Sequence, residues 1–243
     1  MLAVLVTIFP IAASAQGVAP PAPSTSAISA RASQLAAVVS PHDQYVAAEM
    51  AGAKQGFDGS LDANPELRQF GAEHPGLYAH LWKAVEPVFR TSLSNDHPLL
   101  LRRLADIYAR QLTIAEVETL IRFYRSPTGM KLIAAMYRTP DLSSVMSEIT
   151  SAAADGSDVP QSTLNKIQAD AARRATAELG EEDKPTLEAL GRELDLAKMN
   201  GISVQTKQVM LDWVNRADPA LDARVETVVE DAMIAFLSGT KGK

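Results

Sequence analysis

The sequence of residues 112–131 is Leu-Thr-Ile-Ala-Glu-Val-Glu-Thr-Leu-Ile-Arg-Phe-Tyr-Arg-Ser-Pro-Thr-Gly-Met-Lys, which predicts two helices with a sharp turn between them. Thr113 and Glu116 have the spacing of a capping box, in which side chain and backbone satisfy each other at a helix start. An apolar face at helical spacing follows, made by Val117, Leu120, Ile121 and Tyr124, with Phe123 at its edge. Ser126-Pro127 is a second cap followed by a first-turn proline. The expected unit is therefore a helix-elbow-helix.

The rest of the chain extends this prediction to an all-α fold, a compact bundle or array of short helices. Its 243 residues are 47% apolar and only 5% aromatic, and alanine is abundant while β-branched runs are few. Gly129 has no side chain, so another helix can approach the second arm of the elbow closely. The core positions expected in that arm are Leu132, Ile133, Met136 and Tyr137.

Caps and prolines predict the other helices. Ser40 is expected to cap a helix that ends near Gln55, before Gly56 and Gly59. An apolar stripe at 78–89 is expected to kink or break near Pro87. Further helices are predicted at 99–111, 141–154, 161–179, 185–199, 204–216 and 219–237.

A dozen positions of the quoted stretch resemble the signature of an exported bacterial family known as domain of unknown function 2059. They are Leu112, Thr113, Glu116, Val117, Leu120, Ile121, Phe123, Tyr124, Ser126, Pro127, Gly129 and Lys131. The expected extent of the resemblance is roughly 82–146. It implies a small helical module in proteins that carry signal peptides. It implies no reaction, ligand or catalytic residue.

The N-terminus predicts export. Residues 1–30 contain no Asp, Glu, Lys or Arg, and an apolar run ends in Ala13-Ser14-Ala15, the small-residue pattern that signal peptidase accepts. We expect a signal peptide at 1–15, a flexible Pro/Ser-rich spacer at 16–26 and a periplasmic or secreted protein. No transmembrane span is expected after signal removal. The chain has no cysteine, so it can form no disulfide.

Two folded regions are expected, a helical domain at 27–158 that contains the signature and a C-terminal helical region at 159–243 packed on the first. Residues 179–190 can be aligned with 112–123 at an offset of 67, and Lys198 then falls on Lys131. Only the apolar skeleton agrees, and Ser-Pro-x-Gly has no counterpart. The C-terminal region is therefore either a degenerate repeat or an unrelated set of amphipathic helices.

The signature region is basic in an acidic chain. Residues 102–138 carry seven basic and three acidic side chains, although the whole chain has a net charge of −6. This basic island forms a candidate surface for an anionic partner, made by Arg102, Arg103, Arg110, Arg122, Arg125, Lys131 and Arg138. The alternative is that these cations are solvated or paired with the acidic C-terminal half. The acidic balance and the absence of interleaved aromatic residues argue against nucleic acid.

No motif for catalysis, phosphate binding or metal binding is present, and no cofactor is expected. His74 and His80 are six residues apart, which does not place them on one helical face for a zinc pair. The sequence favours a non-catalytic binding or interaction module of the bacterial envelope, with an envelope protein or an anionic envelope component as its partner. The alternatives are an envelope hydrolase whose pocket is built from distant residues and a holdase-like periplasmic helper.

Overall fold

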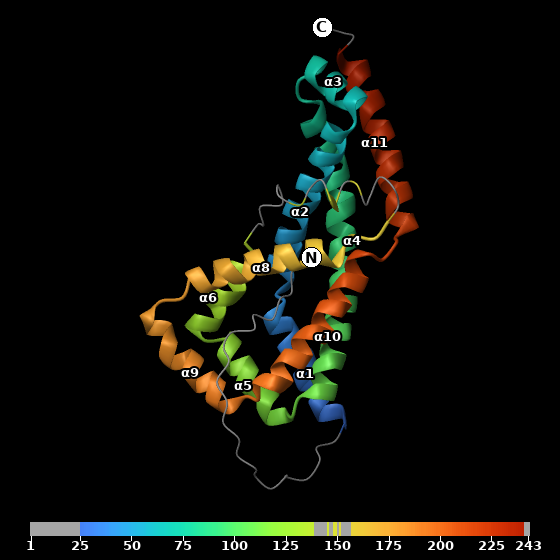
Figure 1. The fold of residues 1–243 in the computed structure, drawn as a ribbon. Coiled ribbons are helices and arrows are strands. Elements are labelled where there is room, and N and C mark those ends of the chain that lie inside the picture. Colours follow the sequence, from blue (N-terminus) through green and yellow to red (C-terminus); the bar gives the residue numbers. More distant parts are fainter. Residues whose placement is uncertain (1–24, 139–144, 146–147, 150, 152–156, 241–243) are drawn as a thin grey trace.

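The computed structural model describes residues 25–138, 145, 148, 149, 151 and 157–240, and in these residues every regular element is a helix (Figure 1). The predicted all-α class is confirmed. The expected signal peptide and most of the helix expected at 141–154 lie outside the described residues. Helix α1 (Thr25–Val39) begins inside the segment expected to be a spacer.

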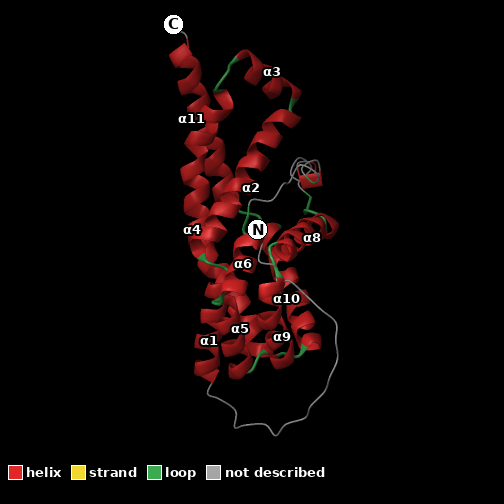
Figure 2. Ribbon diagram, turned by 90° about the vertical axis from the view of Figure 1, so that its left-hand side faces the viewer, coloured by secondary structure: helices red, strands yellow, loops and turns green. Residues whose placement is uncertain are grey.

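The helices form a body and an arm, as Figures 1 and 2 show. The arm consists of α2 (His42–Ala63), α3 (Pro65–Glu73), the N-terminal half of α4 (Leu77–Gln111) and α11 (Pro219–Thr240). The body consists of α1, the C-terminal half of α4, α5 (Ile114–Tyr124), α6 (Pro127–Met136), α8 (Gln161–Ala177), the 3-10 turn η1 (Glu181–Asp183), α9 (Lys184–Glu193) and α10 (Leu196–Val214). One apolar cluster fills the body and extends into the first turns of α2, and a separate cluster lies farther along the arm.

Helix α4 connects the two parts, and it corrects the expected break at Pro87. It runs without interruption from Leu77 to Gln111 with Pro87 and Pro98 inside it. Both prolines are exposed, so their rings crowd the solvent side of the helix. On its other sides α4 packs against α1, α2, α10 and α11, and this packing keeps one helix where two were expected.

Two further boundaries differ from the sequence prediction. Helix α2 continues through Gly56 and Gly59 to Ala63. The boundary expected between helices at 185–199 and 204–216 lies earlier, at Leu194 and Asp195, so α10 runs through Gly201 without a break. A glycine inside a helix costs about 1 kcal/mol relative to alanine, which tertiary packing readily offsets. Glycine is therefore a poor predictor of helix ends in this chain.

The predicted elbow is confirmed. The Glu116 carboxylate accepts from the Thr113 N–H at 2.7 Å, while the Thr113 hydroxyl accepts from the Glu116 N–H at 3.3 Å. The Ser126 hydroxyl accepts from the Gly129 N–H at 3.2 Å. A Cβ at Gly129 would lie 2.1 Å from the Phe123 carbonyl oxygen, so the close neighbour is the last turn of α5 itself.

Candidate functional site

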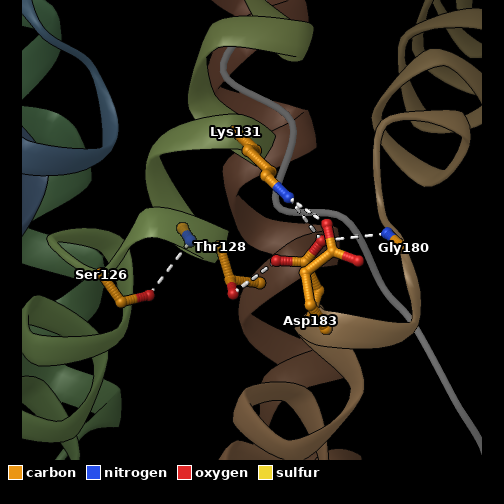
Figure 3. A network of polar contacts seen from close by, with 7 residues as sticks. Ser126, Thr128, Lys131, Gly180 and Asp183 are labelled. Carbon is orange, nitrogen blue, oxygen red and sulfur yellow. Dashed lines mark hydrogen bonds and ion pairs between the residues drawn. The ribbon is translucent and has the colours of Figure 1, made fainter.

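Asp183 is the centre of a polar network between α6 and η1, shown in Figure 3. Its side chain is only 3% exposed. It accepts hydrogen bonds from the Gly180 N–H at 2.9 Å, from Lys131 Nζ at 2.9 Å and from the Thr128 hydroxyl at 2.8 Å. These three donors, led by the Gly180 N–H, lower the pKa of Asp183 to about 2. The network therefore holds a carboxylate at any physiological pH and joins the signature region to the C-terminal half.

A second acid–lysine pair joins the same two regions. Lys198 on α10 contacts the Glu116 carboxylate at 2.6 Å, and the two side chains are 29% and 18% exposed. Burial raises the pKa of Glu116, but hydrogen bonds from Lys198 and from Thr113 outweigh it, and the pKa is lowered overall. We call the two ion pairs, Lys131–Asp183 and Lys198–Glu116, the seam.

The other signature residues have structural positions. Thr113 and Ser126 cap helices, and Pro127 occupies the first turn of α6. The apolar members lie in the core of the body, and these are Leu112, Leu120, Phe123 and Tyr124. Every signature residue named from the sequence therefore serves a cap, the core, the elbow or the seam.

The structure divides the basic island. Three of its cations pair with acidic residues of the C-terminal half: Lys131 in the seam, Arg122 with Glu193 at 2.6 Å and Arg138 with Glu178 at 2.8 Å. Arg103 lies over the Trp213 ring, 5.5 Å from its centroid. Arg102 donates to the Pro98 carbonyl oxygen at 3.4 Å. Among the described residues, Arg102, Arg110 and Arg125 have no acidic side chain within ion-pair distance, and all three are exposed.

A buried polar cluster lies where the arm meets the body, and sequence reasoning missed it. The Tyr137 hydroxyl donates to Ser40 Oγ at 2.8 Å, Ser40 Oγ lies 3.0 Å from His97 Nε2, and His97 Nδ1 lies 3.1 Å from His42 Nδ1. Tyr45 stacks on His97 with ring centroids 4.4 Å apart. Ser40 was expected to cap α2, but this prediction is wrong. Pro41 occupies the N-cap position, and the Ser40 side chain is buried.

The sequence held one signal for this cluster. His97 is in helical register with Leu93, Leu100 and Leu104, so it lies on the apolar face of α4. Nothing local connects it to Ser40, which is 57 residues away. A histidine on an apolar face predicts burial, but its partner follows only from the fold.

The order Ser40, His97, His42 resembles a nucleophile, a base and an orienting group. Burial and the neighbouring charge of His42 lower the pKa of His97 to about 4, so the ring is neutral near pH 7. However, Ser40 is 0% exposed and its oxygen already accepts from Tyr137. In this conformation a substrate carbonyl cannot reach Ser40, and the cluster joins the start of α2 to α4 and α6.

A search with family models matches residues 100–155 to a family described as "Uncharacterized protein conserved in bacteria (DUF2059)". The resemblance inferred from the signature is confirmed over this segment. The match begins at residue 100, later than the expected 82, and extends to 155, beyond the expected 146. No curated protein and no solved structure matches the chain.

Among the described residues, no helix has the length and apolar character needed to cross a bilayer. That part of the chain also holds no group of three or more His, Cys, Asp or Glu side chains suited to a metal ion.

Proposed function

We propose that this protein is exported and is a non-catalytic binding module of the bacterial envelope, with an anionic envelope component as its ligand. The division of the basic island carries this proposal. Four of its seven cations are engaged with C-terminal residues, whereas Arg102, Arg110 and Arg125 are exposed and pair with no described carboxylate. Exposed guanidinium groups bind phosphate and carboxylate oxygens in two-pronged geometry, which suits lipid head groups and cell-wall polymers.

The binding test compares arginines of the two kinds. The double variant Arg110→Gln/Arg125→Gln should weaken co-sedimentation with anionic material several-fold. The matched control Arg122→Gln/Arg138→Gln removes the same charge from paired arginines and should leave binding close to wild type. Wild-type binding should also weaken with added salt, because exposed charges are screened beyond about 8 Å at physiological ionic strength.

Two ligand preparations separate the possible sources of negative charge. Vesicles of phosphatidylglycerol mixed with phosphatidylcholine test lipid head groups, with pure phosphatidylcholine vesicles as the neutral control. Insoluble cell-wall polymer tests the second source. Absent or salt-insensitive binding to both preparations, or equal losses in the two double variants, would contradict the proposal.

The export part of the proposal rests on the small-residue pattern at Ala13-Ser14-Ala15. N-terminal mass spectrometry of protein recovered from outside the cytoplasm should find a mature chain that begins at Gln16. Recovery of the exported protein with Met1 intact would show that the predicted cleavage is wrong.

The Ser40–His97–His42 arrangement supports a second candidate, a hydrolase that opens at the buried polar cluster. A fluorophosphonate probe reacts with activated serines and distinguishes the two candidates. We expect no labelling of the folded protein. Labelling that disappears in Ser40→Ala would favour the hydrolase instead.

A further inference from the structure

Two segments of the body contain three helical elements in the same order. The first, residues 100–137, contains the end of α4, then α5 and α6; the second, residues 161–204, contains α8, η1 with α9, and the start of α10. At an offset of 67, Leu179, Leu187 and Leu190 fall on Leu112, Leu120 and Phe123. The three first-module side chains are buried in the core of the body, and the three leucines of the second module are partly buried and pack against it. We call these segments the first and second modules.

The packing between the modules is reciprocal. Helix α6 of the first module packs on α8 of the second, and α10 of the second packs on α4 of the first. The middle helices α5 and α9 pack on each other, and Figure 1 shows them side by side at the base of the body. Each module therefore places its third helix on the first helix of the other, which is the arrangement that a two-fold axis between α5 and α9 produces.

The ion pairs of the seam obey the same relation. An offset of 67 carries Glu116 to Asp183 and Lys131 to Lys198. The acid of each module binds the lysine of the other: Glu116 with Lys198 at 2.6 Å and Asp183 with Lys131 at 2.9 Å. Each acid also accepts from the backbone N–H three residues before it, at Thr113 or Gly180.

We propose that the second module is a diverged copy of the first, and that the acid and lysine of the signature form a surface that recognises another module of the same kind. In this chain the partner module is supplied by the same polypeptide. Amphipathic helices share an apolar skeleton by chance, but chance does not explain reciprocal helix packing together with two exchanged acid–lysine pairs at one offset. Residues 193–196, Glu-Leu-Asp-Leu, replace Ser-Pro-x-Gly because Asp195 caps α10 instead.

A transplant of the first module's cap into the second tests this equivalence. The double variant Gly180→Thr/Asp183→Glu recreates the Thr113 and Glu116 pair at the corresponding positions. Gly180 has φ −107°, which suits threonine, and the atoms nearest to a Cβ there are those of the Glu182 carboxylate, an exposed group that can move. We expect a melting temperature equal to or above that of wild type, whereas Asp183→Ala should melt several degrees lower. Gly191→Thr, in open space and away from any cap, controls for the added threonine and should bring only the small gain that replacing a helical glycine gives.

A second measurement tests Lys131, the lysine of the first module that pairs with the acid of the second. Lys131→Met should lower the melting temperature of the transplant by about as much as it lowers that of wild type, because the glutamate introduced at position 183 takes over the ion pair. The reciprocal transplant, Thr113→Gly/Glu116→Asp, should fold with a small loss. A transplant that melts like Asp183→Ala, or that is insensitive to Lys131→Met, would overturn the proposal; so would failure of both transplants to fold.

Discussion

The two modules share their seam and differ in their elbows. In the first, Ser126 caps α6 and Gly129 lies against the last turn of α5, with no space for a side chain. In the second, Asp195 caps α10 by accepting from the N–H groups of Ala197 and Lys198. The signature therefore contains two kinds of position. The acid, the lysine and the leucines serve contact between modules, while Ser-Pro-x-Gly serves one particular tight turn.

The modules also differ in what covers them. Tyr137 is 7% exposed and donates to Ser40, which fixes the first module to the start of α2. The corresponding position of the second module is Val204, which is 61% exposed. The buried polar cluster is therefore a feature of the first module alone.

The largest expected effect is at the first elbow. Pro127→Ala/Gly129→Leu should destabilise the protein by more than about 3 kcal/mol, because the new side chain would overlap the Phe123 carbonyl and force α5 and α6 apart. A glycine of α9 in the second module serves as the control: Gly191→Ala meets no atom within 4 Å and should stabilise the helix by up to about 1 kcal/mol. Chemical denaturation of both variants measures the difference. Equal, small shifts would mean that Gly129 does not lie at a close contact.

Acid should next loosen the buried polar cluster around His97, which connects Tyr137 of the first module to the start of α2. Unfolding restores an ordinary histidine pKa of about 6.5, whereas the folded pKa is about 4, so the unfolded state binds the proton more readily. Stability should therefore fall by up to about 3 kcal/mol as the pH drops from 6.5 to 4. Denaturation curves at a series of pH values measure this loss.

The controls for this prediction are two histidine variants. His97→Gln should flatten the dependence in that range, while His80→Gln, on the exposed surface of the arm, should leave it unchanged. A wild-type stability that is constant between pH 6.5 and 4 would show that His97 protonates without strain. The lowered pKa values of Glu116 and Asp183 add a further loss at lower pH.

Sequence reasoning succeeded where interactions are local. The capping box, the Ser126 cap and the elbow depend on residues no more than three apart, so their spacing is visible in the sequence. It failed at Pro87, Gly56 and Gly59, where packing between helices overrides local preference. It also missed the Ser40–His97 contact and left the pairing of Lys131 open, because these contacts join residues more than 50 positions apart.

A smaller effect is expected for the exchanged pair of the seam. Glu116→Lys or Lys198→Glu alone should each cost about 1–2 kcal/mol, since each leaves two like charges together in a partly exposed site. The double swap Glu116→Lys/Lys198→Glu should recover part of that loss, although a lysine at position 116 cannot accept from the Thr113 N–H. A double-mutant cycle measures the coupling. A coupling energy of zero would mean that this pair contributes nothing to contact between the modules.

The smallest effect concerns the two caps that differ between the modules. Ser126→Ala and Asp195→Ala should each cost about 1 kcal/mol, because each removes the side-chain acceptor for N–H groups at a helix start. The serine accepts from one N–H and the ionised aspartate from two, and a negative charge also interacts favourably with the positive end of the helix dipole. Asp195→Ala should therefore cost slightly more than Ser126→Ala, and Asp195→Ser should lie between wild type and Asp195→Ala. Urea denaturation of the three variants decides the order. A larger loss for Ser126→Ala would show that the serine holds the elbow itself, beyond capping α6, and that the two modules turn by different means.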